Sequence, residues 1–121
     1  MMRITLVCCL FLMVQAVSAQ VPVSQQLAQT AIHNWPDSFL IGNDKAAKWR
    51  YDQGVILKGV ESVWKQTGVG KWYEYIQKSM DFFVEKDGSI KGYKPAEFNI
   101  DHINNGKLLL LIYQVTEKEK I

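Results

Sequence analysis

The sequence predicts an all-α fold built from antiparallel helix pairs. Apolar residues recur at helical spacing in four segments, and short links with glycine, proline or aspartate separate most of them. No segment of convincing length alternates apolar and polar residues as a half-buried strand does. Helices joined by short links pack in antiparallel order. We therefore expect residues 20–121 to form one helical domain at most.

Residues 1–19 are predicted to be a cleavable signal peptide rather than part of this fold. Arg3 is the only charge, an apolar run follows from residue 4 to residue 14, and small residues precede a cleavage site after Ala19. The run is too short to span a bilayer comfortably, so a retained membrane anchor is the weaker interpretation. We expect a periplasmic or secreted protein with no membrane partner after cleavage.

Composition excludes several classes of site. Cys8 and Cys9 both lie in the signal peptide, so the mature chain has no disulfide, thiolate metal site or cysteine nucleophile. The full chain has 14 basic and 12 acidic residues, and cleavage of the signal peptide removes one basic residue, Arg3. The mature chain is therefore almost neutral, whereas a nucleic-acid partner would need a basic stripe. Phosphate loops, nucleophile elbows and metal-ligand spacings are not found. We therefore expect no nucleic-acid partner, no metal and no cofactor.

The first predicted helix covers residues 23–34. Ser24 is its candidate cap. Trp35-Pro36 ends it, because the residue before proline is pushed out of the helical region. Its predicted apolar face consists of Leu27, Ala31 and Ile32.

The second predicted helix begins at Asp52 and ends at Thr67, with Gly68 in the left-handed terminating position. Gly54 and Gly59 lie inside it, and each costs a helix about 1 kcal/mol relative to alanine. We therefore expect another helix or a ligand to come close to both glycines. The predicted apolar face consists of Val55, Ile56, Val60, Val63 and Trp64.

Two further helices are predicted at residues 71–85 and 102–117. The earlier one ends before Asp87-Gly88, and the later one contains LLLLIY without a polar side. A helix that is apolar all round lies inside a domain, surrounded by other helices. Since three other helices hardly surround it, we expect the chain to be part of a larger domain. The apolar face of the earlier helix consists of Trp72, Tyr75, Ile76, Ser79 and Phe83.

The connection across residues 86–101 is longer than the others and has only SIKGY as a possible strand. Compact domains rarely keep structureless connections of about 12 to 15 residues unless these have a function. This connection places Asp101 and His102 at the start of the last predicted helix. Aspartate is among the best helix caps, so position alone favours a cap for Asp101 over a site. Asn104 and Asn105 could bond the first helical turn or a ligand.

The motifs YDQG, at residues 51–54, and NIDHINNGK, at residues 99–107, resemble the unsaturated glucuronyl and rhamnogalacturonyl hydrolases. The nearer resemblance is to glycoside hydrolase family 105, and it covers residues 35–116. It implies that these are the opening helices of an (α/α)6 barrel, a six-hairpin toroid that is incomplete in this chain. Residues 20–121 would then be the N-terminal part of the glycosidase domain.

The resemblance also implies a reaction. Family members remove a 4,5-unsaturated uronic acid, galacturonyl or glucuronyl, from the non-reducing end of oligosaccharides made by polysaccharide lyases. They hydrate the double bond, with a proton added at C4 and water at C5, and the unstable product opens and releases the next sugar. This differs from the usual glycosidase scheme with two carboxylates at the anomeric centre. The expected partner is therefore an unsaturated oligosaccharide.

The resemblance implies four site residues within residues 35–116. Asp101 matches one of the family's two catalytic aspartates, and the other, which acts as general acid and base, is not in this sequence. Tyr51 matches an aromatic position that lines the sugar site, and Trp49 and His102 are candidate substrate contacts. Without the resemblance, Tyr51 and Trp49 would be core aromatics. A helix N-terminus favours an ionised carboxylate, so Asp101 suits the orientation of water or a sugar hydroxyl better than proton donation.

Two hypotheses follow from these residues. In the first, the chain is part of an exported hydrolase and is inactive alone, because its second aspartate is missing. In the second, it is a non-catalytic helical module, either a carbohydrate-binding module or a remnant of the family.

Overall fold

The computed structural model describes residues 20–36 and 48–117. The predicted signal peptide lies outside these residues, so its cleavage stays a prediction. All regular elements in the described part are helical, as expected, apart from one isolated β-bridge. They are α2 (Val23–Asn34), α3 (Tyr51–Thr67), α4 (Gly70–Asp81), the short 3-10 turns η2 (Pro95–Glu97) and η3 (Ile100–His102), and α5 (Ile103–Thr116).

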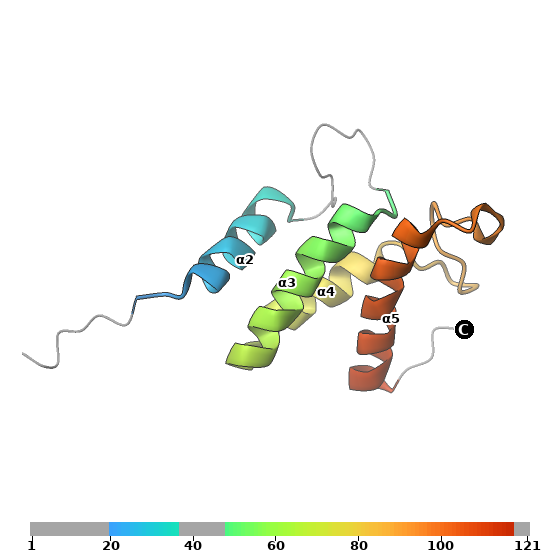
Figure 1. The fold of residues 1–121 in the computed structure, drawn as a ribbon. Helices are drawn as coiled ribbons and strands as arrows, with labels where there is room; N and C mark the ends of the chain where they lie inside the picture. The colour runs from blue at the N-terminus through green and yellow to red at the C-terminus, as the bar shows by residue number, and fades with distance from the viewer. Residues whose placement is uncertain (1–19, 37–47, 118–121) are drawn as a thin grey trace, which may run out of the picture.

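The helices run alternately up and down (Figure 1). α3 and α5 are parallel, α4 runs antiparallel to both, and α2 packs beside α3. α3 contacts each of the other three helices. As a result, the N-termini of α3 and α5 lie at the same end of the bundle, and the segment with η2 and η3 lies at that end as well (Figure 1).

The core lies between α3, α4 and α5. The predicted face of α4 is confirmed, because all five of its residues, including Phe83 beyond the helix end, are buried. Each large apolar side chain buried in this way contributes about 1.5 to 3 kcal/mol. The core cluster consists of Ala28, Trp49, Leu57, Val60, Val63, Trp72, Tyr75, Ile76, Met80, Phe83, Leu108, Leu111 and Ile112.

Most predicted helix ends agree with the structure to within one residue, but the end of α4 does not. α3 begins at Tyr51, one residue before Asp52, but it ends as expected, with Gly68 at a φ of 66°. α4 ends at Asp81 rather than residue 85. The chain instead turns around Gly88 so that Val84 pairs with Ile90, and the expected SIKGY strand is reduced to this bridge.

The predicted face of α2 is partly wrong. Ala31 is buried and Ile32 is partly buried against the core, as expected, but Leu27 is exposed and Ala28 is buried in its place. Ser24 is not the cap, since Pro22 holds that position and its carbonyl oxygen accepts hydrogen bonds from two backbone amides of the first turn. Small side chains allow the close helix contact, which a leucine at the interface would prevent.

The described helices cover only one side of α5. Leu108, Leu111 and Ile112 are buried, whereas Leu110 and Tyr113 are exposed. The expectation that α5 is surrounded on all sides is therefore not met within the described residues. None of the described helices is long and apolar enough to cross a membrane.

Tyr75 connects α4 to the end of α2 and provides a pH-dependent prediction. Its hydroxyl donates a hydrogen bond to the carbonyl oxygen of Trp35 at 2.9 Å, and burial raises the pKa of Tyr75 to about 12. An unfolded tyrosine has a pKa of about 10. The contribution of Tyr75 to the free energy of unfolding is thus fully present below pH of about 10 and is lost as the pH rises towards about 12.

We therefore expect Tyr75→Phe to lower the free energy of unfolding by about 1 kcal/mol at neutral pH through loss of the hydrogen bond. The variant should also lose less stability than the wild type when the pH is raised above about 10. Urea unfolding of both proteins across this pH range measures the two effects. A variant with the same alkaline loss as the wild type would contradict the role of Tyr75.

Candidate functional site

The two motifs meet where α3 and α5 begin. Trp49, just before α3, donates a hydrogen bond from its indole Nε1 to the carbonyl oxygen of His102 at 3.0 Å. Its ring is 3% exposed and packs edge-on against Phe83, with ring centroids 5.5 Å apart. The segment that leads into α3 is therefore tied to the turn that leads into α5.

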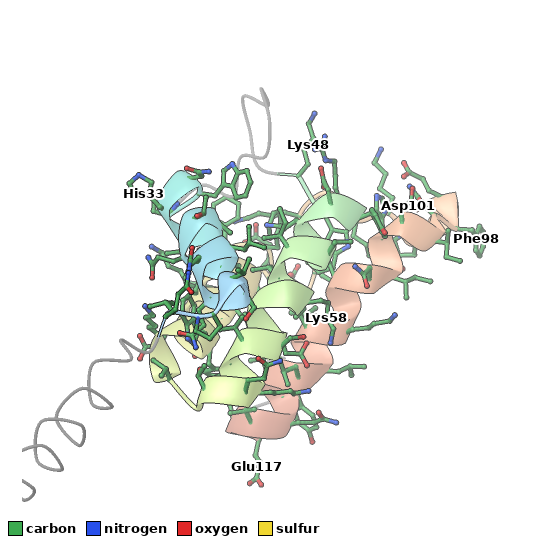
Figure 2. All side chains as sticks on the ribbon, turned by 60° about the vertical axis from the view of Figure 1, so that its left-hand side comes forward. His33, Lys48, Lys58, Phe98, Asp101 and Glu117 are labelled. Atoms are coloured by element: carbon green, nitrogen blue, oxygen red, sulfur yellow. The ribbon has the colours of Figure 1, made fainter. Side chains whose placement is uncertain are left out.

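Asp101 lies in η3 and is exposed at this end of the bundle (Figure 2). It is not a helix cap, so the cap expectation is wrong. Asn99 caps the turn instead, and its Oδ1 accepts the backbone N–H of Asp101 at 3.0 Å. The physical reason is that a 3-10 turn precedes α5 and moves the capping position upstream. Within the described part of the chain, no hydrogen bond or ion pair engages the Asp101 carboxylate.

Tyr51 is the first residue of α3 and is 55% exposed, so its ring is accessible to solvent. It lies at the same end of the bundle as Asp101, but no hydrogen bond joins the two side chains. That the two residues belong to one site, and that either contacts a substrate, stay predictions.

His102 lies beside a pocket of about 340 Å³. Its ring packs against Tyr93, with centroids 5.9 Å apart, and its Nε2 lies 3.4 Å from the amide nitrogen of Asn99. Its Nδ1 is buried without a hydrogen-bond partner in the described residues. Sequence reasoning gave Tyr93 no role, and a single tyrosine in a loop offers no signal. The pocket is lined by Trp49, Ile90, Tyr93, His102, Ile103, Gly106, Lys107 and Leu110.

The structure thus divides the predicted site residues into two groups. Trp49 and His102 share the pocket, whereas Asp101 and Tyr51 are not among the residues that line it. Because so little of Trp49 is exposed, its main observed role is packing, and a contact with a sugar stays a prediction. The described residues contain no group of histidines and carboxylates that could hold a metal ion.

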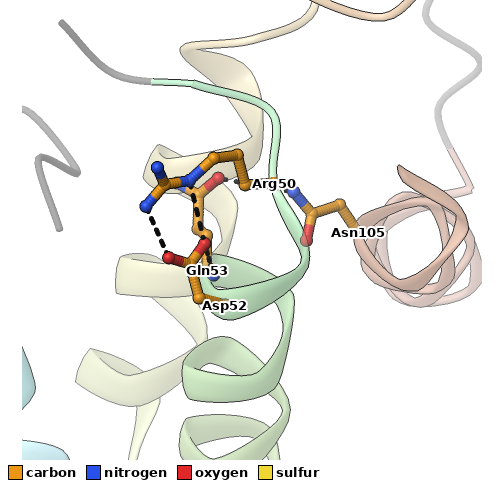
Figure 3. Close-up of polar contacts among 4 residues, drawn as sticks. All are labelled: Arg50, Asp52, Gln53 and Asn105. Atoms are coloured by element: carbon orange, nitrogen blue, oxygen red, sulfur yellow. Dashed lines mark hydrogen bonds and ion pairs between the residues drawn. The ribbon is translucent and has the colours of Figure 1, made fainter. Parts of the chain in front are cut away.

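A buried amide pair connects the two motifs below this surface. Asn105 Nδ2 donates a hydrogen bond to Gln53 Oε1 at 3.4 Å (Figure 3). Asn105 is 0% exposed and Gln53 is 3% exposed. The remaining amide groups, Gln53 Nε2 and Asn105 Oδ1, have no hydrogen-bond partner in the described chain. The sequence left the partner of Asn105 open, and the structure gives it a protein partner on α3.

Helical spacing could have identified both residues of this pair. Asn105 comes three residues before Leu108, and Gln53 comes four residues before Leu57. Such spacings place each amide on the buried face of its helix. A polar side chain on that face needs a hydrogen-bond partner, which the other motif provides.

Gly54 allows the close approach of α3 and α5 at this pair. A Cβ atom at Gly54 would overlap Asn105 Oδ1 and would lie 2.7 Å from Asn104 Nδ2. The expectation of a close neighbour is therefore confirmed at Gly54. At Gly59 no described helix comes close, because a Cβ there would meet no described atom within 4 Å, and the expectation of a ligand there stays a prediction.

An ion pair holds the first turn of α3. The Arg50 guanidinium contacts both carboxylate oxygens of Asp52, at 2.6 and 3.3 Å, and Asp52 Oδ1 also accepts the backbone N–H of Gln53 at 2.9 Å (Figure 3). Both side chains are partly exposed, so the pair contributes at most about 1 kcal/mol. Its position fixes the backbone on either side of Tyr51.

Comparison with known proteins agrees with the resemblance of the two motifs. The model of Glycosyl Hydrolase Family 88 matches residues 23–121. The chain is also similar to the solved structure of a glycoside hydrolase from family 105 of C. acetobutylicum ATCC 824, with 38% sequence identity and a TM-score of 0.63. The similarity covers 78% of this chain and 25% of that chain. The chain belongs to glycosyl hydrolase family 88, is similar to family 105, and contains the opening helices of an (α/α)6 barrel.

Proposed function

We propose that this chain is the N-terminal part of an exported glycoside hydrolase that acts on oligosaccharides made by polysaccharide lyases. The enzyme removes the 4,5-unsaturated uronic acid from the non-reducing end by hydrating its double bond. The observation that carries this proposal is the position of the YDQG and NIDHINNGK motifs at one end of the bundle. The Gln53–Asn105 hydrogen bond joins them, and a second bond links Trp49, two residues before YDQG, to His102. The family match over residues 23–121 supports it.

The proposed roles follow from exposure and charge. The Asp101 carboxylate has no partner in the described residues, so it is available to orient a water molecule or a sugar hydroxyl. The exposed ring of Tyr51 offers an aromatic face to the sugar. His102, which follows Asp101 in the chain, and Trp49 are among the residues that line the pocket. The proton donor is an aspartate that this sequence does not contain.

An activity assay tests the proposal. We expect the protein, in the longest form that its gene encodes, to consume an unsaturated disaccharide, measured as loss of the ultraviolet absorbance of the conjugated uronate. The rate should exceed the uncatalysed rate by at least about 10⁶-fold. Residues 20–121 alone should show no turnover, because the proton donor is absent. Sugar binding without turnover by the longest form would favour the carbohydrate-binding module instead.

In the same assay, we expect Asp101→Asn to lower kcat/KM about a hundredfold, since loss of the charged oxygen misorients the attacking group. The melting temperature should not change, because the carboxylate forms no hydrogen bond or ion pair with a described residue.

The matched control is Asp87→Asn, an exposed aspartate of the hairpin turn. Its Oδ1 accepts the backbone N–H of Ser89 at 2.9 Å, and an asparagine oxygen preserves that bond. This variant should keep full activity. An Asp101→Asn protein as active as the control would remove Asp101 from the site.

A further inference from the structure

We propose that the buried Gln53–Asn105 pair is a positioning element of the active site, which fixes the start of α5 against the start of α3. This inference rests on the function proposed above. It assigns a role to two amides that neither the motif resemblance nor the sequence explained. The pair would hold the backbone that carries Asp101 in a fixed orientation relative to the backbone that carries Tyr51.

The first argument is the position of the pair in the chain. Gln53 comes two residues after Tyr51, and Asn105 comes four residues after Asp101. Both amides are almost fully buried, whereas Tyr51 and Asp101 are exposed. The two proposed site residues therefore have little packing of their own, and their placement depends on the backbone that the buried pair holds.

A second hydrogen bond lies on the other side of Tyr51 and closer to Asp101 in the chain. The bond from Trp49 to the His102 carbonyl lies two residues before Tyr51 and one residue after Asp101. Tyr51 is thus bracketed by Trp49 and the amide pair. With two hydrogen bonds at separate points, the turn before α5 can neither rotate nor slide freely along α3.

The third argument is the chemistry of the pair. A hydrogen bond specifies a distance and an angle, whereas an apolar contact specifies neither. Gln53 Nε2 and Asn105 Oδ1 are buried without a described partner, which disfavours the folded state. Apolar side chains of similar shape would avoid this loss. Stability alone therefore does not account for the pair, but control of orientation does.

The test compares three variants of the protein in the longest form that its gene encodes. Asn105→Leu keeps the shape of the side chain but leaves the Gln53 amide unpaired, so its Tm should fall. Addition of Gln53→Met removes both amides, and the double variant should regain the wild-type Tm. If the pair positions the site, kcat of the double variant stays at least about tenfold below that of the wild type, with KM little changed.

Val63→Ala is the control for a purely structural loss. Val63 is buried on α3, ten residues beyond Gln53 and far from the two motifs in the chain. This variant should lower Tm without lowering kcat at a temperature where it is folded. A double variant that regains both Tm and kcat would overturn the proposal, since the pair would then be structural only.

Hydrogen exchange tests the inference independently of activity. The backbone amides of Asp101 and His102 are bonded to Asn99 within the turn that the pair supports. In the double variant, these amides should exchange about tenfold faster than in the wild type, while amides around Ile76 keep their rates. Unchanged exchange at Asp101 would overturn the inference. Absence of turnover by the wild type would overturn the proposed function, and the exchange result would still decide whether the pair orders this turn.

Discussion

Replacement of Gly54 by alanine is expected to lower the free energy of unfolding by about 2 to 3 kcal/mol, although alanine is the better helix former. The added Cβ would overlap Asn105 Oδ1, and it would also lie 3.2 Å from the backbone nitrogen of Asn105. A side-chain rotation of Asn105 cannot relieve both contacts and would break the bond to Gln53. The helices must therefore move apart, which weakens the core contact between α3 and α5.

Gly59→Ala is the matched control, because it makes the same change five residues further along the same helix. A Cβ at Gly59 meets no described atom within 4 Å, so only the helix preference of alanine acts. This variant should be more stable than the wild type by up to about 1 kcal/mol. Urea unfolding followed by tryptophan fluorescence measures both changes. Equal effects of the two substitutions would mean that α5 does not approach α3 closely at Gly54.

The helices of this chain could be predicted because local patterns determine them. The buried face of α4 follows the apolar spacing from Trp72 to Ile76, and Gly68 ends α3 because a left-handed residue is needed there. The all-α class follows from the same patterns. The (α/α)6 barrel was predicted from the motif resemblance, because the spacing of apolar residues indicates helices but not how they are arranged.

Contacts between helices could not be predicted in the same way. The difference between Gly54 and Gly59 depends on where α5 crosses α3, which neither helix encodes by itself. The exposure of Leu27 has a similar cause, since α2 turns its alanines towards α3. The wrong cap expectation for Asp101 has a local cause, because asparagine and aspartate are both good caps and the 3-10 turn places Asn99 at the capping position.

Phe83→Ala is expected to have the largest effect on stability, a loss of about 3 to 5 kcal/mol in the free energy of unfolding. Phe83 is 1% exposed and lies two residues after the end of α4. Its ring supports the buried indole of Trp49, so truncation would leave a cavity beneath the tether to His102. The Phe83 backbone also stabilises the turn that pairs Val84 with Ile90, since its carbonyl oxygen accepts the N–H of Lys91 at 2.9 Å. That bond survives the substitution, and the expected loss is therefore one of packing.

Phe82→Ala is the control, because it removes a phenylalanine at the end of α4 without opening a cavity in the core. Phe82 is 41% exposed, and its ring contacts Phe83 edge-on and the Lys91 ammonium group at 4.7 Å. Phe82→Ala should therefore cost only about 1 kcal/mol. Urea unfolding of the two variants gives the comparison, and tryptophan fluorescence should report a changed environment of Trp49 only for Phe83→Ala. If Phe82→Ala were the more destabilising variant, the exposed ring of Phe82 rather than the buried ring of Phe83 would stabilise the turn between Val84 and Ile90. The position of Trp49 would then not depend on Phe83.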